Sequence, residues 1–379
     1  MAWVSGQAGG GLCDVGFVFV RDGVLRQRGS LEGGMRAVVW RGPENVQVET
    51  VPDPEVLEPH TALVRVAAAS ICGSDLHLYH ATVPVLPGTI LGHEAVGTVV
   101  SVGSQVERVR PGDRVLVPAV VGCGDCPSCR HGYPVGCESL PVRVLGVSPL
   151  LAGVQAEYVA VPYADYNLWT LPPEVEDHDA LMLADIFPTG FFAAENAGVQ
   201  PGQVVVVLGC GPVGLCAIQC VQLFSPAGVV AVDPVAERLE VAASFGATVL
   251  SVADDVAGHV RRLTRGQGAD AVIEAVGSEE TLRLAFDLVR TGGRVSMVGV
   301  LVREDVPFPL ATAFLKDVTL RVGLVNVPRY LPQLFALLRR GKLNPKRLLT
   351  HTFPLSEAPA AYKTFDRKAD GCLKVCLEP

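Results

Sequence analysis

The 379-residue sequence lacks any run of eighteen apolar residues, so it predicts no membrane-spanning helix. It also has no dense stripe of lysine and arginine, and its formal charge of -8 argues against nucleic acid as a partner. No positive charge precedes the short apolar stretch at residues 15–20, as a secretory signal requires. These absences leave a cytoplasmic protein with small-molecule partners as the expected class.

Apolar residues, by contrast, are abundant. Hydrophobic residues make up 49% of the chain and charged residues 18%, which suffices for well-buried cores. Because 379 residues exceed the usual size of one core, two domains are expected. Residues 1–34 are rich in glycine, and we predict that they form a disordered leader outside the fold.

The remaining chain divides by its pattern of strands and helices. Residues 35–187 contain short β-like runs broken by proline and glycine, which predicts a β-rich domain. Residues 188–322 alternate strands with helices of about ten residues, the pattern of a doubly wound parallel sheet. Residues 323–379 hold strand-like segments too few to fold alone, so we expect them to return to the first domain. The fold class is therefore α/β.

Metal-binding residue types occur in a glycine-rich frame between residues 70 and 106. The first part reads Cys72-Gly-Ser-Asp-Leu-His77, and the second reads Gly-His93-Glu94-x2-Gly-x5-Gly. A thiolate, an imidazole and a carboxylate suit zinc, and three protein ligands leave one position open for a substrate. This stretch therefore predicts an enzyme.

Four closely spaced cysteines follow in the pattern Cys123-x2-Cys126-x2-Cys129-x7-Cys137. Four thiolates in a short loop can wrap a tetrahedral zinc ion with bonds of about 2.3 Å, and they leave no position for water. We therefore expect a structural zinc site. The alternative, a pair of disulfides, is disfavoured because a reducing compartment is expected.

A dinucleotide-binding pattern begins with the β-branched run at residues 204–208, which leads into Gly209-x-Gly211-x2-Gly214 and a helical stretch. A second strand follows and ends in Asp233, about twenty residues beyond the glycines. This order of elements predicts a dinucleotide site rather than a structural turn. Asp233 would bind the ribose hydroxyls and repel a 2′-phosphate, so NAD is favoured over NADP.

Five motifs in this order resemble those of the medium-chain dehydrogenase/reductase superfamily, in particular its zinc-dependent alcohol, polyol and formaldehyde dehydrogenases. Besides the four sets above, residues 185–190 read Asp-Ile-Phe-Pro-Thr-Gly. The resemblance covers residues 35–379 and implies a GroES-like catalytic domain interrupted by a Rossmann domain, with the active site between them. It also implies hydride transfer between an alcohol and NAD, and a homo-oligomer, either a dimer or a tetramer.

The resemblance further implies roles for single residues. The catalytic zinc ligands would be Cys72, His93 and Asp185, while Glu94 would either ligate the ion in place of water or lie behind the ligands. Asp75 would orient the histidine ligand, although an aspartate at this place can also cap the turn. With the four-cysteine loop, two zinc ions per chain are expected.

Further residues are implied in proton transfer and cofactor binding. Ser74 and His77 would relay the proton of the alcohol to solvent, and Thr189 would touch the nicotinamide. The other cofactor-binding residues implied by the motifs are Gly209, Gly211, Pro212, Val213, Gly214, Asp233, Arg238, Val298 and Gly299.

Two other functions are open at this point. A zinc-free quinone or enoyl reductase of the same superfamily would have no use for Cys72, His93 and Asp185. A non-enzymatic dinucleotide-binding scaffold would need neither Ser74 nor His77. The joint presence of these residues favours a zinc alcohol dehydrogenase with an alcohol or aldehyde as its substrate.

Overall fold

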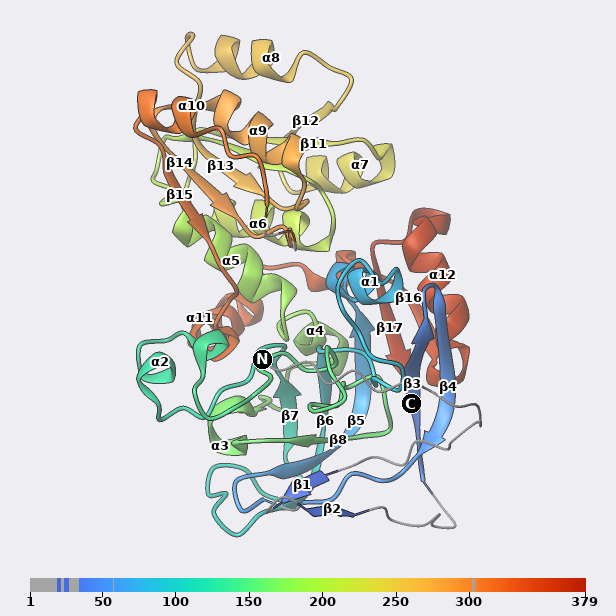
Figure 1. Cartoon of the computed structure of the whole chain (residues 1–379). Coiled ribbons are helices and arrows are strands. Elements are labelled where there is room, and N and C mark those ends of the chain that lie inside the picture. Colours follow the sequence, from blue (N-terminus) through green and yellow to red (C-terminus); the bar gives the residue numbers. More distant parts are fainter. Residues whose placement is uncertain (1–18, 22–23, 27–33, 57, 302, 304) are drawn as a thin grey trace.

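Figure 1 shows the computed structural model of the chain, with one sheet in the upper part of the molecule and another in the lower part. The structure describes residues 19–21, 24–26, 34–56, 58–301, 303 and 305–379. Most of the leader predicted at residues 1–34 lies outside the described residues, apart from the antiparallel pair β1 (Phe19–Arg21) and β2 (Val24–Arg26). None of the described helices is long and apolar enough to cross a membrane.

The lower sheet combines strands from the first part of the chain and from its C-terminal segment. Its seven strands follow the order β16-β17-β5-β6-β7-β9, and β8 pairs with β5 beside this path. β17 runs antiparallel to β5, so the C-terminal segment lies next to the strand that leads to Cys72. The strands are β5 (Ala62–Ile71), β6 (Ala95–Val102), β7 (Arg114–Val117), β8 (Tyr158–Val161), β9 (Trp169–Thr170), β16 (Leu349–Pro354) and β17 (Lys374–Glu378).

A hairpin and short helices surround this sheet. β3 (Met35–Gly42) and β4 (Asn45–Val51) form the antiparallel hairpin. The first six residues of β5 alternate between buried and more exposed side chains, as expected for a strand with one face on a core. The helical segments are α1 (Gly73–Tyr79), α2 (Pro127–Arg130), η1 (Pro134–Gly136), α3 (Ala164–Asn167), α4 (Asp177–Leu181), η2 (Pro345–Arg347), η3 (Leu355–Glu357), α12 (Ala358–Arg367) and η4 (Ala369–Gly371).

The upper sheet has six parallel strands in the order β12-β11-β10-β13-β14-β15. They are β10 (Val204–Leu208), β11 (Gly228–Asp233), β12 (Thr248–Ser251), β13 (Ala269–Glu274), β14 (Val289–Met297) and β15 (Thr319–Val322). The helices of this part and its borders are α5 (Ile186–Asn196), α6 (Pro212–Gln222), α7 (Ala236–Ser244), α8 (Val256–Leu263), α9 (Glu279–Leu288), α10 (Leu310–Leu315) and α11 (Val327–Arg339). All five side chains of β10 are buried, as in a strand covered on both faces. The predicted α/β class with a doubly wound parallel sheet is confirmed.

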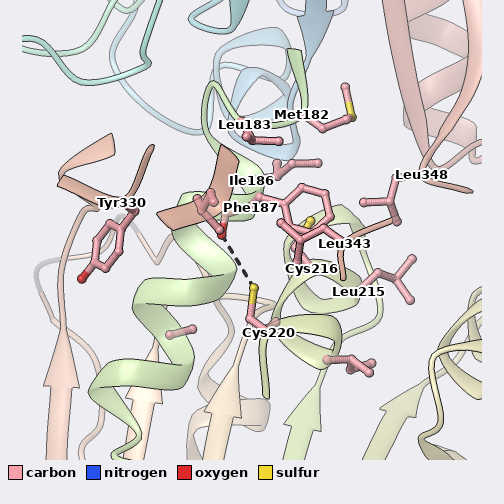
Figure 2. Packing of buried hydrophobic residues seen from close by; sticks show 14 of the residues in the cluster. Met182, Leu183, Ile186, Phe187, Leu215, Cys216, Cys220, Tyr330, Leu343 and Leu348 are labelled. Atoms are coloured by element: carbon pink, nitrogen blue, oxygen red, sulfur yellow. Dashed lines mark hydrogen bonds between the residues drawn. The ribbon is translucent and has the colours of Figure 1, made fainter. Parts of the chain in front are cut away.

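One hydrophobic core joins the two parts of the molecule. Figure 2 shows part of it, including Phe187 of α5, Cys220 of α6 and Tyr330 of α11. The same cluster contains Cys72 and Val205, so it supports both the cysteine turn and the dinucleotide strand. Each large apolar side chain buried there contributes about 1.5–3 kcal/mol, which stabilises the contact between the two parts.

The boundary between α9 and β14 differs from the sequence expectation. The pattern predicts a helix to residue 290 and a strand from residue 293, whereas α9 ends at Leu288 and β14 begins at Val289. Val289 is buried and pairs with Ala269 of β13, so burial of a β-branched side chain in the sheet outweighs helical periodicity. The pattern also gave no elements for residues 310–322, where α10 and β15 lie.

Candidate active site

Cys72 lies where β5 turns into α1. Its backbone N–H donates to Asp75 Oδ2 at 2.9 Å, and the backbone N–H of Asp75 donates to the Cys72 carbonyl at 3.0 Å. These two bonds satisfy free backbone groups at the helix start, so Asp75 caps the turn as one reading of the sequence predicts. The turn fixes the Cys72 thiol, which is buried.

Cys72, His93, Glu94 and Asp185 come together from separate parts of the chain. Each offers one ligand atom, and these atoms all lie within 4.8 Å of one another. The Cys72 sulfur and His93 Nε2 are each 3.7 Å from Asp185 Oδ2. Ligand atoms on one tetrahedral zinc ion lie about 3.3–3.8 Å apart, so this spacing fits the metal.

A chain of polar contacts holds His93 from behind. Its Nδ1 lies 3.2 Å from Asp75 Oδ1, which leaves Nε2 facing the cluster. Gln155 donates to Asp75 Oδ2 at 3.3 Å and accepts a hydrogen bond from the Tyr362 hydroxyl at 2.8 Å. Asp75 therefore both caps the turn and orients the imidazole, as carboxylates behind metal-binding histidines generally do. Sequence analysis missed Gln155 and Tyr362, because no local motif contains them.

Asp185 immediately precedes α5, and its carboxylate completes the cluster. Thr189, one turn further along the helix, donates its hydroxyl hydrogen to Asp185 Oδ1 at 3.0 Å. The other oxygen, Oδ2, remains directed toward Cys72 and His93. The residue expected to touch the nicotinamide is thus also the residue that fixes a metal-binding carboxylate.

Ser70 and Lys374, which the sequence analysis also missed, hold Glu94. Lys374 Nζ lies 2.5 Å from Glu94 Oε2, and both side chains are fully buried. The Ser70 hydroxyl donates to the same oxygen, whereas Glu94 Oε1 has no hydrogen-bond partner among the described residues. Because an unpaired buried charge is very costly, each of the two ionised groups depends on the other.

The electrostatics of the cluster favour a bound cation. Burial by itself lowers the pKa of His93, but the carboxylates of Asp75 and Asp185 outweigh it and raise that pKa well above its usual value. Burial raises the pKa of Asp185, but its contact with His93 outweighs this and lowers that pKa. The buried negative charge therefore draws a positive charge to this point, which is what a zinc ion would supply.

The four cysteines of the loop around α2 also lie together, each with its sulfur within 4.8 Å of the others. The backbone N–H groups of Asp125 and Cys126 donate to Cys123 Sγ at 3.4 and 3.2 Å, and Cys123 N–H donates to Cys137 Sγ at 3.3 Å. Burial opposes ionisation of Cys123, but a hydrogen bond from Ser139 and the backbone donors lower its pKa to about 6. The described cysteines form no disulfide. This donor set fits a closed tetrahedral zinc site.

The glycine triplet turns the chain from β10 into α6. Gly209 has φ +92°, a conformation that side-chain residues rarely adopt, and a Cβ on Gly214 would lie 1.8 Å from the Gly209 carbonyl oxygen. Gly211 differs, because a Cβ there would meet only Arg238 Nη1, at 3.7 Å. Packing inside the protein does not require glycine at this position. A pyrophosphate approaching the α6 N-terminus does, so the turn fits a dinucleotide.

Asp233 ends β11 beside this turn and is buried. Its Oδ2 accepts a hydrogen bond from Cys210 N–H at 2.7 Å, and its Oδ1 accepts one from Val235 N–H at 2.8 Å. Arg238 of α7 lies against the turn, and its buried Nε has no hydrogen-bond partner among the described residues. A carboxylate and a guanidinium thus border the space next to the glycine turn.

Glu274, at the end of β13, is a buried acid that the sequence analysis missed. Its carbonyl accepts from Val298 N–H and Gly299 N–H at 2.9 and 3.0 Å, and its Oε1 accepts from Val276 N–H and Gly277 N–H at 2.9 and 2.8 Å. Glu274 therefore ties together the two loops that follow β13 and β14. An acid that ends an apolar strand could have drawn attention to it.

Ser74 and His77 lie one helical turn apart on α1. Ser74 Oγ is 3.2 Å from His93 Nε2, which places the hydroxyl at the metal cluster. His77 Nδ1 is 3.1 Å from Thr82 Oγ1. Burial, and to a smaller extent the neighbouring His80, lowers the pKa of His77. The ring is consequently neutral near pH 7 and able to accept a proton.

The dinucleotide helix packs close to the metal cluster. Cys216 of α6 is fully buried, and its burial raises the pKa of its thiol well above the usual value. α6 also packs against α5, the helix that begins directly after Asp185, because the Cys220 thiol lies 4.0 Å from the Phe187 carbonyl oxygen. The two halves of the site therefore meet at the shared core, to which Cys216 belongs (Figure 2).

Known proteins share both halves of this arrangement. A family model described as an alcohol dehydrogenase GroES-like domain matches residues 58–173, and one described as a zinc-binding dehydrogenase matches residues 212–340. A probable zinc-binding alcohol dehydrogenase of Mycobacterium tuberculosis is 43% identical over 345 residues, covering 91% of this chain and 89% of the relative. The chain belongs to the zinc-dependent alcohol dehydrogenases. Its membership of the medium-chain dehydrogenase/reductase superfamily, which the motifs resemble, is thereby confirmed.

Solved structures of this family share the fold. Alcohol dehydrogenase TADH from Thermus sp. ATN1 is 45% identical with a TM-score of 0.85, over 91% of this chain and 99% of that one. An Escherichia coli alcohol dehydrogenase complexed with NADH is 28% identical with a TM-score of 0.81, over 91% and 99%. A putative zinc-binding dehydrogenase of Sinorhizobium meliloti bound to NADP is 29% identical with a TM-score of 0.79, over 92% and 100%. The chain is thus an alcohol oxidoreductase that uses zinc and a nicotinamide cofactor, in a GroES-like and Rossmann architecture.

Proposed function

We propose that this enzyme binds its catalytic zinc through Cys72, His93 and Asp185 and oxidises an alcohol with NAD to an aldehyde or ketone. The observation that carries the proposal is the convergence of these three ligand groups next to the core that they share with the dinucleotide helix α6. Bound there, zinc supplies a Lewis acid that polarises the alcohol oxygen. Bound NAD supplies the hydride acceptor.

The residues around the ligands control orientation and proton movement. The Asp75 carboxylate lies against Nδ1 of the His93 ring, and its negative charge favours the proton on Nδ1, which leaves Nε2 free for the metal. Ser74 places a hydroxyl at the cluster, where it can take a proton from the substrate. His77, kept neutral by burial, marks the outer end of the proton path. The buried core around Cys72 excludes water from the reaction.

Glu94 has its own role in this proposal. Lys374 and Ser70 engage Glu94 Oε2, which leaves Oε1 as the oxygen able to reach the ion. We infer that Glu94 stands behind the three ligands and approaches the metal through Oε1 alone. Lys374 restrains that approach, because moving the carboxylate away from Nζ would separate two buried charges.

The four-cysteine loop is proposed to hold a second, structural zinc ion. Support comes from the four converging sulfurs of Cys123, Cys126, Cys129 and Cys137 and from the backbone N–H groups directed at them. With no ligand position left for water, this ion would stabilise the loop without taking part in chemistry. Unpaired thiolates of this kind persist in a reducing compartment, which supports a cytoplasmic location.

NAD rather than NADP is proposed as the cofactor. Asp233 is buried and negatively charged beside the glycine turn, so a 2′-phosphate there would meet like charge. Arg238 lies nearby and would contact the adenosine side of the cofactor. Thr189 of α5 would border the nicotinamide, together with Val298 and Gly299 on the loop that Glu274 fixes.

A homo-oligomer is proposed through the edge of the upper sheet. β15 is the outermost strand of that sheet, and large apolar side chains beside it are exposed. The exposed fractions of Leu310, Phe314 and Leu315 of α10 are 69%, 82% and 79%. An apolar face next to an open strand edge suits pairing with a second copy. A monomeric mass in light scattering would contradict this proposal.

The proposed function is tested by NADH production from a panel of primary, secondary and polyhydric alcohols, with and without a chelator. We expect chelator-sensitive oxidation that added zinc restores, and Asp185→Asn should abolish it. Asp179→Asn is the matched control, because Asp179 lies outside the ligand cluster. Chelator-insensitive reduction of activated alkenes would indicate the zinc-free reductase instead. Absence of turnover with every substrate would indicate the scaffold.

A further inference from the structure

A third cluster of metal-binding side chains lies at the C-terminal end of β17. It consists of Cys376 and Glu378 of that strand and His178 of α4. Sequence analysis assigns these residues no role, because the cysteine and the histidine belong to no motif. The tertiary fold alone brings them together.

The three side chains face one another. Cys376 and Glu378 are two residues apart in a strand, so they point to the same face of the sheet. His178 Nε2 lies 3.1 Å from Glu378 Oε1, and the Cys376 sulfur lies within 4.8 Å of a ligand atom on each. Ligand atoms on one zinc ion lie about 3.3–3.8 Å apart, so the three side chains are already close to the spacing that a shared ion requires.

The donor set matches zinc. It contains one thiol, one imidazole and one carboxylate, the same three types as Cys72, His93 and Asp185. Hard cations such as magnesium and calcium select oxygen donors alone, whereas sulfur with nitrogen selects zinc and similar ions. Cys376 is fully buried, and the side chains of His178 and Glu378 are 45% and 50% exposed, so an ion could enter from solvent. We propose that His178, Cys376 and Glu378 form a third zinc-binding site.

This site should be weaker than the other two. Burial, with the nearby charge of Glu378, raises the pKa of Cys376 to about 12, so binding must displace a thiol proton. Among the described residues only three donors lie at this point, and two of them are on exposed side chains. The site therefore fills as free zinc rises, and it is expected to be empty when zinc is scarce.

Zinc at this point would join α4 to β17. Every second side chain of β17 points to the same face, and on this face lie Lys374, Cys376 and Glu378. Lys374 is also the partner of Glu94 in the active site. A zinc ion bound to His178, Cys376 and Glu378 would restrain the strand that positions Lys374. Because the unfolded chain does not hold the three groups together, binding also stabilises the folded enzyme.

The test is equilibrium dialysis of the full chain against rising zinc, followed by metal analysis and thermal unfolding. Wild-type enzyme should bind one ion more than Cys376→Ser, His178→Gln or Glu378→Gln. Removing a ligand should raise the dissociation constant of that ion at least about tenfold and abolish the zinc-dependent rise in Tm. Cys372→Ser is the matched control, since Cys372 is a buried thiol of the same segment outside the cluster. It should keep the extra ion.

Equal zinc content in wild type and in all three variants would overturn the proposal. His178→Gln and Glu378→Gln alter exposed side chains, so they keep the test decisive if Cys376→Ser fails to fold. Ion counting does not require turnover. Failure of the proposed catalytic or structural site would remove an ion from every protein, including the control, and would therefore be distinguishable.

Discussion

The proposed structural zinc site and the proposed catalytic zinc site of this enzyme are built in opposite ways. The four cysteines lie in one short loop, and the hydrogen bonds to their sulfurs include several from that loop's own backbone. Cys72, His93 and Asp185 come from separate segments. Asp75, which lies against His93, belongs to the turn of Cys72, and Lys374, which holds the neighbouring Glu94, comes from β17. The loop can form locally around an ion, whereas the catalytic cluster exists only once both parts of the fold are in place.

Their environments differ in the same sense. Cys123 and Cys126 are only half-buried, while Glu94 and Lys374 are fully buried. Charges interact far more strongly in the interior than near water. Loss of a zinc ligand in the loop should chiefly reduce stability, whereas loss of a zinc ligand in the buried cluster should chiefly reduce activity.

The largest expected effect is the loss of a zinc ligand, which should reduce activity at the catalytic site and stability at the structural site. Cys72→Ala should lower kcat/KM by more than about a hundredfold, because loss of a ligand exceeds the effect of losing a supporting residue. It should keep one zinc ion per chain. Cys126→Ala should instead lower Tm by at least about 5 °C, since metal binding contributes to folding. Metal analysis, steady-state kinetics and thermal unfolding of both variants check this. Equal effects on Tm and kcat/KM in the two variants would erase the distinction.

The second largest effect concerns the buried ion pair between Lys374 and Glu94, which is found beside the catalytic cluster and has no counterpart among the described residues of the cysteine loop. Lys374→Met leaves Glu94 as an uncompensated buried charge, so we expect a loss of about 3–5 kcal/mol in the free energy of unfolding. Adding Glu94→Gln should recover much of that loss. Lys363→Met is the control, because Lys363 is exposed on α12. Urea unfolding measures all three proteins, and a loss no greater than in the control would show that the pair is dispensable.

Cofactor preference should change by a smaller amount. Asp233→Ser removes the negative charge beside the ribose, so the ratio of kcat/KM for NAD to that for NADP should fall about tenfold, or about 1.4 kcal/mol. Glu240→Gln serves as control, because it removes one exposed charge from α7 of the same domain. If the unmodified enzyme already prefers NADP, the carboxylate does not select the cofactor.

The smallest effect concerns His77. Its pKa in the folded protein lies below the 6.5 of an exposed histidine, so the unfolded chain binds the proton more readily. Stability should fall as pH drops below about 6.5 and level off once pH passes the folded pKa. His77→Gln should lack this loss and also lack the acidic inflection in the pH profile of kcat. His131→Gln, at an exposed histidine, should retain both. A profile unchanged in His77→Gln would remove His77 from the proton path.

Much of the site could be predicted because its motifs are local. Gly92, with φ +91°, fixes the turn directly before His93, and Gly209 fixes the turn into α6. Each of these glycines lies within a few residues of the functional residues that its turn positions, so one short stretch of sequence contains the turn and the functional residues together. Asp185 was different, because only the family resemblance marked it as a ligand.

The remaining parts depend on tertiary pairing. Lys374 reaches Glu94 because β17 pairs with β5, and no pattern in residues 372–378 indicates that pairing partner. Gln155 and Tyr362 meet Asp75 for the same kind of reason. Periodicity also misplaced the start of β14, where burial of Val289 decides the structure.

The most direct test is anomalous diffraction at the zinc absorption edge, from crystals of the zinc-loaded enzyme. The expected result is a strong peak bonded to Cys72 Sγ, His93 Nε2 and an oxygen of Asp185, beside a second peak among the four cysteines. A peak among the cysteines with none between Cys72, His93 and Asp185 would contradict the assignment of the catalytic centre.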